Sequence, residues 1–168
     1  SQGIRATFDS SNNKVVIAYA DFGNSGYGTA IVGTVSGTSI SFGTATSFHN
    51  AAFVRGAITF DSSNNKVVVG YGDSGNSNYG TARVGTVSGT GISFGTEVVF
   101  NSGGTDEMSA TFDSNNNKVI FTFADDAASG RGSIVSGSVS GTSISFGSTN
   151  AYENGDTLFT SATFDTTT

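Results

Sequence analysis

The residues best suited to bind a ligand lie in two copies of one short segment, 52 residues apart. Carboxylate and amide groups can hydrogen-bond sugar hydroxyls, and an aromatic ring can cover the apolar face of a sugar. The segment therefore predicts one weak carbohydrate site per copy, and several weak sites bind a multivalent ligand more tightly. The alternative is an ordinary loop between strands. The candidate ligand-binding residues are Asp21, Asn24, Tyr27, Asp73, Asn76 and Tyr79.

Calcium is the metal that a second group of side-chain oxygens could bind. Asp9, Asn12 and Asn13 lie close together in the sequence, and the same pattern recurs 52 and 104 residues later. Calcium takes about 6–8 oxygen ligands, but this segment lacks the dense carboxylates and the fixed glycine of a calcium loop. An Asp followed by Asn residues is also typical of a tight turn. We therefore expect a hairpin turn and assign no metal site.

Residue types used in hydrolysis are present, but their arrangement does not predict a catalytic site. Asp125 and Asp126 are adjacent, and neighbours in a strand point to opposite faces, whereas a glycosidase pair must face one bond at ~5–9.5 Å. His49 is the only histidine, and its counterparts in the repeat are Asn101 and Glu153. A lone histidine predicts no Ser-His-Asp arrangement. Without cysteine, thiol catalysis and thiolate metal sites are excluded. We expect no catalytic residues and no cofactor.

The elements that position these residues come from a sequence that repeats every 52 residues. A Thr-Phe-Asp triplet begins at Thr7, Thr59, Thr111 and Thr163, and the copies align without a gap. Residues 1–52 and 53–104 are identical at 32 of 52 positions. Such a period indicates a repeat architecture. The chain is therefore interpreted as a single repeat domain, 1–168. Its parts are unit 1 (1–52), unit 2 (53–104), unit 3 (105–156) and the first strand of a fourth unit (157–168).

Each unit is predicted to be a four-stranded antiparallel sheet. In unit 1, apolar, β-branched and aromatic runs predict strands at residues 5–9, 14–21, 29–35 and 39–42, the last continuing toward Phe48. Clusters of Asp, Ser, Asn and Gly between the runs predict turns. The run at 14–21 is nearly continuous, which is typical of a strand covered on both faces. No segment carries a helical period.

These features predict an all-β fold that is β-propeller-like. A propeller has ~4–8 blades of four strands, so three units and one extra strand do not close one. We therefore expect a homo-oligomer or further repeats of a longer array to complete the sheet. A β-trefoil, which also has three four-stranded repeats and closes alone, is one alternative. Another stacked β-repeat is the second.

Composition excludes several partner classes. The net charge is −6, from 7 Lys and Arg against 13 Asp and Glu, so the basic surface that nucleic acids need is missing. No apolar run approaches the ~20 residues of a membrane span. The polar, weakly charged composition is typical of an extracellular or virion-surface protein. Fourteen Phe and five Tyr indicate a folded chain rather than a disordered one.

The arginines do not follow the repeat. Arg83 stands where unit 1 has Ile31. Because an unpaired buried arginine is costly, this position is expected to face solvent or a partner rather than a sealed core. Arg55 aligns with Glu107. This change of sign leaves a contact between units open, but a solvated surface is the simpler expectation.

The repeated pattern ATFDSSNNKVVIAY, followed by GTVSGTSISFGT, covers residues 6–44, is copied at 58–96 and returns more loosely at 110–147. It resembles the repeats in long arrays of marine phage structural and tail-fibre proteins and of some bacterial surface proteins. The resemblance implies a non-catalytic structural or adhesive role on a virion appendage or a cell surface. It implies no catalytic residues. The alternatives are a lectin with one weak site per repeat and, second, a glycoside hydrolase. The third unit departs from the pattern at residues 126–132.

Overall fold

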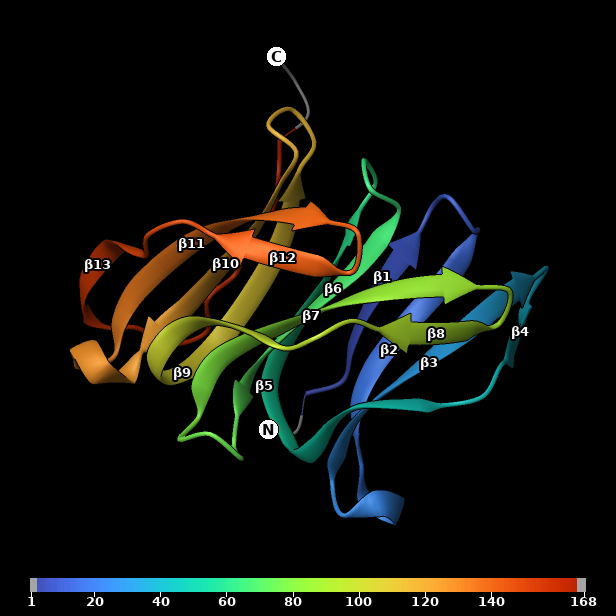
Figure 1. The fold of residues 1–168 in the computed structure, drawn as a ribbon, viewed down its shortest axis with the longest axis horizontal. Coiled ribbons are helices and arrows are strands. Elements are labelled where there is room, and N and C mark those ends of the chain that lie inside the picture. Colours follow the sequence, from blue (N-terminus) through green and yellow to red (C-terminus); the bar gives the residue numbers. More distant parts are fainter. Residues whose placement is uncertain (1–2, 166–168) are drawn as a thin grey trace.

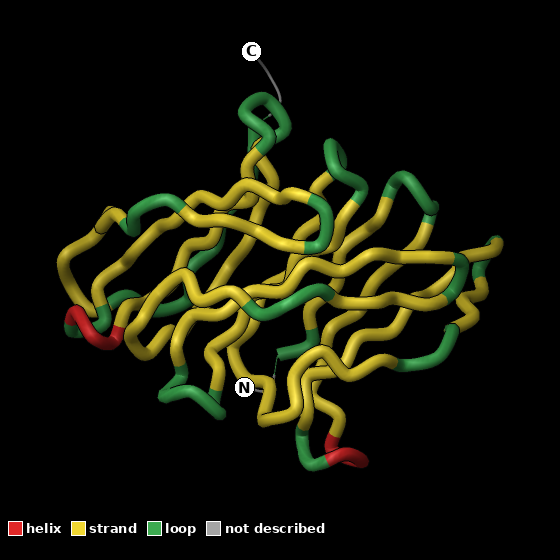
Figure 2. Tube along the Cα trace, viewed as in Figure 1, coloured by secondary structure: helices red, strands yellow, loops and turns green. Residues whose placement is uncertain are grey.

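The protein is all-β, with one open antiparallel sheet of 13 strands. The computed structural model describes residues 3–165. Figure 1 shows three groups of strands side by side, from the blue N-terminal group to the orange C-terminal group. Two short 3-10 turns, η1 (Phe22–Asn24) and η2 (Asp126–Ala128), are the helical segments of the described chain (red in Figure 2). None of these is a helix long and apolar enough to cross a membrane.

Unit 1 forms a meander in which each strand pairs with the next. Its strands are β1 (Arg5–Asp9), β2 (Lys14–Asp21), β3 (Tyr27–Ser36), β4 (Ser39–Phe42) and the first half of β5 (Thr46–Asp61). β1 pairs with β2, and β2 pairs with β3. β4 and the first half of β5 both pair with β3, so the expected fourth strand is present but interrupted at residues 43–45.

A close approach between units explains the interruption. The amide of Gly43 still donates to the Val32 carbonyl at 2.9 Å, which continues the ladder for one residue. A Cβ added at Gly43 would lie 1.9 Å from the carbonyl oxygen of Thr90, in the turn of the next unit. Gly95 stands in the same relation to Thr142, at 1.8 Å. Only glycine lets the two backbones approach so closely.

The same pairing recurs 52 residues later in each following unit. Unit 2 continues from β5 with β6 (Lys66–Asp73), β7 (Tyr79–Ser88), β8 (Gly91–Phe94) and the first half of β9 (Val98–Asp113). Unit 3 continues from β9 with β10 (Lys118–Asp125), β11 (Arg131–Ser140), β12 (Ser143–Phe146) and β13 (Asn150–Asp156). The register is the same in every unit: the pair Phe8↔Val15 recurs as Phe60↔Val67 and as Phe112↔Val119.

The long strands β5 and β9 each join two units. The first half of β5 pairs with β3, and the second half pairs with β6 after a bulge between Val54 and Ala57. At the bulge Arg55 has a φ of 54°, and Glu107 in β9 has a φ of 47°. Phe159 takes the same repeat position, with a φ of 57°. A left-handed residue therefore turns the chain from the edge of one unit to the start of the next.

Apolar side chains from the strands of two neighbouring units form one core at each junction between units. We call the face of a unit that is turned toward the preceding unit its leading face, and the opposite face its trailing face. Between units 1 and 2, Val16 and Val32 meet Val69 and Tyr71. β6 is buried along almost its whole length, because unit 1 covers its leading face and unit 3 its trailing face. This explains the near-continuous apolar run.

The second junction repeats the first. Val68 and Val84, the counterparts of Val16 and Val32, meet Phe121 and Phe123 of unit 3. The rings of Phe100 and Phe121 stack with centroids 5.3 Å apart. Large side chains thus project from the leading face toward a trailing face that consists of small aliphatic side chains and one phenylalanine, Phe48 or Phe100.

The expected opening strand of a fourth unit is not formed in residues 157–165. The thirteenth strand is instead β13, which completes unit 3 by pairing with β11. In every unit the opening strand pairs in a hairpin with the strand that follows, and within the described residues no strand follows 157–165. They run beside β9, where the amide of Ala162 donates to the Ser109 hydroxyl at 3.0 Å. Residues 166–168 of that prediction lie outside the described residues.

Candidate functional site

The predicted sugar-binding residues lie where strands end and turns begin. Asp21 Oδ1 accepts the amide of Gly23 at 3.0 Å, and Asp73 Oδ1 accepts that of Gly75 at 2.9 Å. Asp21 is paired with Tyr27 across the ladder. The structure therefore brings each Asp beside its Tyr, as Asp73↔Tyr79 shows in unit 2. The remaining two, Asn24 and Asn76, are exposed in the turn.

The Asp-Asn segments form hairpin turns, as expected. Asp9 Oδ1 accepts the amides of Ser11 at 3.0 Å and Asn12 at 2.9 Å, and Oδ2 accepts the Asn12 side chain at 2.8 Å. Asn13 has a φ of 54°, the left-handed conformation that a tight turn requires. Both carboxylate oxygens are therefore used by the turn. Within residues 3–165, no group of three or more His, Asp or Glu side chains is placed to hold a metal ion.

A polar cleft of about 540 Å³ lies at the junction between units 1 and 2. It contains four charged or titratable side chains that come from different elements: His49 from β5, Asp73 from the end of β6, Arg83 from β7 and Glu97 from the segment before β9. The uncharged lining residues are Asn50, Ala51, Gly75 and Thr96. Of the predicted ligand-binding residues, this cleft includes Asp73.

His49 occupies the centre of the cleft and is buried. Its Nε2 lies 3.3 Å from Asp73 Oδ1, and its Nδ1 lies 3.4 Å from Glu97 Oε1. The Nε2 contact lacks hydrogen-bond geometry, so this buried nitrogen has no hydrogen-bond partner. The ring lies 4.6 Å from the ring of Tyr71. One imidazole thus separates two carboxylates.

Tyr71 and Arg83 connect the cleft to the core. The Tyr71 hydroxyl donates to Glu97 Oε1 at 2.9 Å, and burial together with the Glu97 charge holds the pKa of Tyr71 far above its usual range. Arg83 Nε donates to the Gly95 carbonyl at 2.8 Å, and its NH1 reaches the Phe48 carbonyl and lies 3.8 Å from Glu97. The arginine therefore reaches the neighbouring unit at the Phe48 carbonyl and has two further partners in its own unit, in line with its expected place outside a sealed core.

Among the described residues the cleft has one copy, because Arg83 and Glu97 break the repeat. The counterparts of Glu97 are Ala45 and Thr149, and those of Arg83 are Ile31 and Val135. Sequence reasoning treated His49 as a merely polar position and overlooked Glu97. The available signal was that titratable or charged side chains replace the repeat residues at positions 49, 83 and 97.

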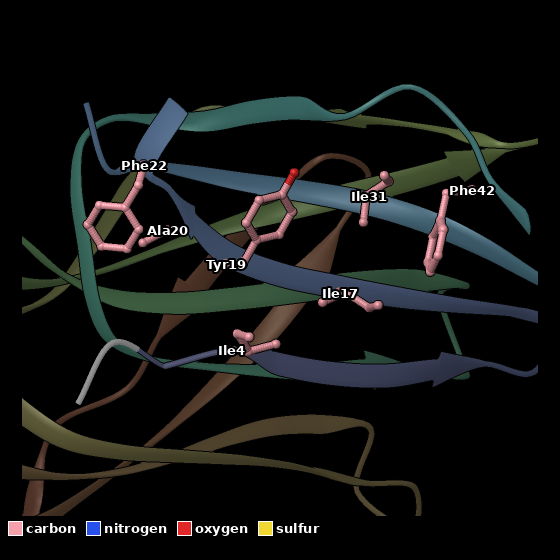
Figure 3. Close-up of a pocket in the computed structure, with 7 residues that line it drawn as sticks. All are labelled: Ile4, Ile17, Tyr19, Ala20, Phe22, Ile31 and Phe42. Carbon is pink, nitrogen blue, oxygen red and sulfur yellow. The ribbon is translucent and has the colours of Figure 1, made fainter. Parts of the chain in front are cut away.

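A second cavity, of about 550 Å³, is apolar and lies on the leading face of unit 1 (Figure 3). Ile17, Tyr19 and Phe42 contribute to it, and their counterparts Val69, Tyr71 and Phe94 in unit 2 pack against unit 1. Unit 1 has no unit in front of it in the described chain. The full lining is Ile4, Ile17, Tyr19, Ala20, Phe22, Ile31 and Phe42.

Asp125 and Asp126 lie in different surroundings. Asp125 is buried and its Oδ1 accepts the Asn101 side chain at 3.2 Å. Asp126 is largely exposed at the start of η2. The pKa of its carboxyl is raised, mainly because neighbouring residues remove part of its water and secondly because Asp106 carries a like charge nearby. The pair does not converge on a common point.

Arg55 forms an ion pair with Asp106 across the junction between units 2 and 3. The sequence favoured a solvated surface for Arg55, whereas in the structure this arginine contacts the next unit. Both side chains remain partly exposed, at 49% and 25%. The pair is consequently a weak link that adds to the apolar core.

Comparison with known proteins does not assign the chain to a family: no family model matches the sequence, and no curated protein matches it.

Proposed function

We propose that this chain is a non-catalytic structural or adhesive β-repeat module of a virion appendage or a cell surface. The observation that carries this proposal is the repeated apolar junction, in which Tyr71 and Phe123 hold equivalent places in two successive cores. Repeated positions such as Phe60 and Val67 serve this junction, and Asp61 serves a turn. The resemblance to phage and bacterial surface arrays supports the same role.

A propeller-like arrangement of the units accounts best for the course of the opening strands. β1, the second half of β5 and the second half of β9 meet around a cavity of about 260 Å³. Equivalent positions line it, including Ala6, Ile58 and Ala110. In a propeller the first strand of every blade lies next to the central axis. The sheet is open, which disagrees with a trefoil that closes on itself.

An activity screen tests the non-catalytic role. The purified chain is incubated with a panel of chromogenic glycosides that covers common sugars and both anomers. We expect no turnover above that of a buffer blank. Turnover that Glu97→Gln abolishes would overturn the proposal, because a single carboxylate of the cleft would then be needed for a reaction.

Carbohydrate binding is a second candidate, which the polar cleft favours specifically. Its carboxylates can accept bonds from sugar hydroxyls, and Asn50 and the unpartnered Nε2 of His49 add further polar groups. This candidate is a single site at the cleft, which differs from the one weak site per repeat that the sequence predicts. A glycan array probed with the labelled chain tests it. Glu97→Gln should remove binding, whereas Glu153→Gln, at an exposed glutamate on β13 outside the cleft, should retain it.

A further inference from the structure

The leading face of unit 1 has the pattern of an interface but is uncovered. In unit 2, Phe60 and Ile92 are 9% and 6% exposed, because unit 1 covers them. Their counterparts in unit 1, Phe8 and Ile40, are 53% and 43% exposed. The open face also lacks the positive charge that Arg83 gives unit 2, because unit 1 has Ile31 at the equivalent position. Contiguous apolar surface of this kind marks an interaction site.

The trailing face of unit 3 carries a matching socket of about 450 Å³. At the internal junction, the Tyr71 ring lies 5.6 Å from the ring of Phe48 and 6.3 Å from that of Phe53. The counterparts of these two phenylalanines in unit 3 are Tyr152 and Thr157, and both line the socket. The remaining lining residues are Thr122, Ile134, Leu158, Phe159, Thr160 and Ser161. The socket is therefore the place that a further Tyr71 counterpart would fill.

That counterpart on the open face is Tyr19. We propose that a second copy of this chain docks head to tail, with Tyr19 and Phe42 of one copy against the socket of unit 3 of the other. The contact continues the two internal junctions. A heterologous contact of this type generates a ring or a filament. The inference deepens the proposed structural role, since it names the partner surface.

Two features of unit 3 set the strength of this contact. Thr122 and Ser136 stand where unit 2 has Gly70 and Val84. Less apolar area is therefore buried than at the internal junctions, and the hydrophobic free energy scales with that area. We accordingly expect an assembly that depends on protein concentration.

Residues 162–165 must move aside when the second copy docks. They carry the same Ala-Thr-Phe-Asp sequence as residues 6–9 of β1, and they lie where β1 of the docked copy would come to rest. β1 is held to β2 by five paired residues, whereas residues 162–165 belong to no strand. β1 therefore stays in place. A chain that ends at Ser161 is expected to assemble more tightly than the full chain.

Sedimentation equilibrium over a wide concentration range measures the assembly. The average mass of the wild-type chain should rise with concentration. Phe42→Glu on the open face and Leu158→Glu at the socket should each raise the dissociation constant at least about tenfold, because each buries an unpaired charge. Val99→Glu, at an apolar residue of unit 2 that is 46% exposed, is the matched control and should leave assembly unchanged. Circular dichroism verifies that each variant folds.

Mixing the two variants distinguishes head-to-tail docking from a symmetric contact. Phe42→Glu keeps an intact socket, and Leu158→Glu keeps an intact open face, so the mixture should form one-to-one complexes that grow no further. A wild-type mass that stays monomeric at every concentration would overturn the proposal. So would a mixture that associates no better than its components. Neither result affects the non-catalytic role, which fails only if the glycoside screen shows turnover.

Discussion

The Tyr71 hydroxyl donates a 2.9 Å hydrogen bond to Oε1 of Glu97, and this bond connects a completely buried ring to a carboxylate at the rim of the cleft. It ties β6 to the segment that leads into β9 within unit 2. Unit 1 has Ala45 in place of the glutamate, so the equivalent tyrosine, Tyr19, cannot form the bond. The repeat has thus acquired a local polar link at one junction.

The stability of the fold should decrease at alkaline pH because of Tyr71. Its pKa is raised in the folded state, so the folded protein keeps the proton when the unfolded chain, with a tyrosine pKa of about 10, releases it. The contribution is fully present below pH ~10 and is lost as the pH rises further. Urea unfolding between neutral pH and pH ~11 measures it. Tyr71→Phe should start about 1 kcal/mol less stable and decline less steeply; parallel curves would contradict this.

The charged pair Arg83 and Glu97 should be replaceable only as a pair. Glu97→Ala alone removes a partner of Arg83 and of Tyr71 and should lower the free energy of unfolding by about 1 kcal/mol. The double variant Arg83→Ile with Glu97→Ala restores the residues of unit 1. It should therefore be closer to the wild type than the single variant is, as measured by thermal unfolding. A double variant less stable than Glu97→Ala would argue against this.

Glycine at position 107 should stabilise the protein. Glu107 has a φ of 47°, and the left-handed conformation costs a non-glycine residue about 1 kcal/mol. Glu107→Gly removes that strain, so the melting temperature should rise by roughly 2–4 °C for a chain of this size. Thr111→Gly is the control in a regularly paired part of β9, where glycine only weakens the strand. A lower melting temperature for Glu107→Gly would show that its side chain matters more than its backbone.

The hairpin-turn carboxylates should act without calcium. Asp61 is buried and both its oxygens accept hydrogen bonds from the turn, so Asp61→Ala should cost about 2 kcal/mol of stability. Added calcium or a chelator should leave the melting temperature unchanged. A calcium-dependent increase that Asp61→Ala removes would indicate a metal site instead.

Acid should weaken the third turn only below the pH at which an ordinary aspartate takes up its proton. Hydrogen bonds from Asn116 hold the pKa of Asp113 below its usual range. A group with a lowered folded pKa stabilises the fold above the unfolded pKa, and the benefit is lost as the pH falls through the folded value. Nuclear magnetic resonance of the Asp113 carboxyl during acid titration should show a midpoint below that of a model aspartate. A midpoint equal to that of an aspartate in an unfolded peptide would contradict the turn geometry.

The sequence by itself determined the all-β class, the strand positions within a unit and the hairpin turns. These features depend on local chemistry that every copy repeats: β-branched runs, Asp-Asn turns and glycines at positive φ. The match between Asn13 and Asn65, both at φ near 55°, illustrates how a local rule fixes a local conformation.

The tertiary structure decided the features that join residues from different units. His49, Asp73 and Glu97 are far apart in the sequence, and they meet only because unit 2 packs its leading face on unit 1. Residues 157–165 form no strand for a different reason: no described strand pairs with them, and a strand needs a neighbour to accept its backbone hydrogen bonds. A 52-residue period predicts each unit, but which side chains meet across a junction depends on how two sheets face one another.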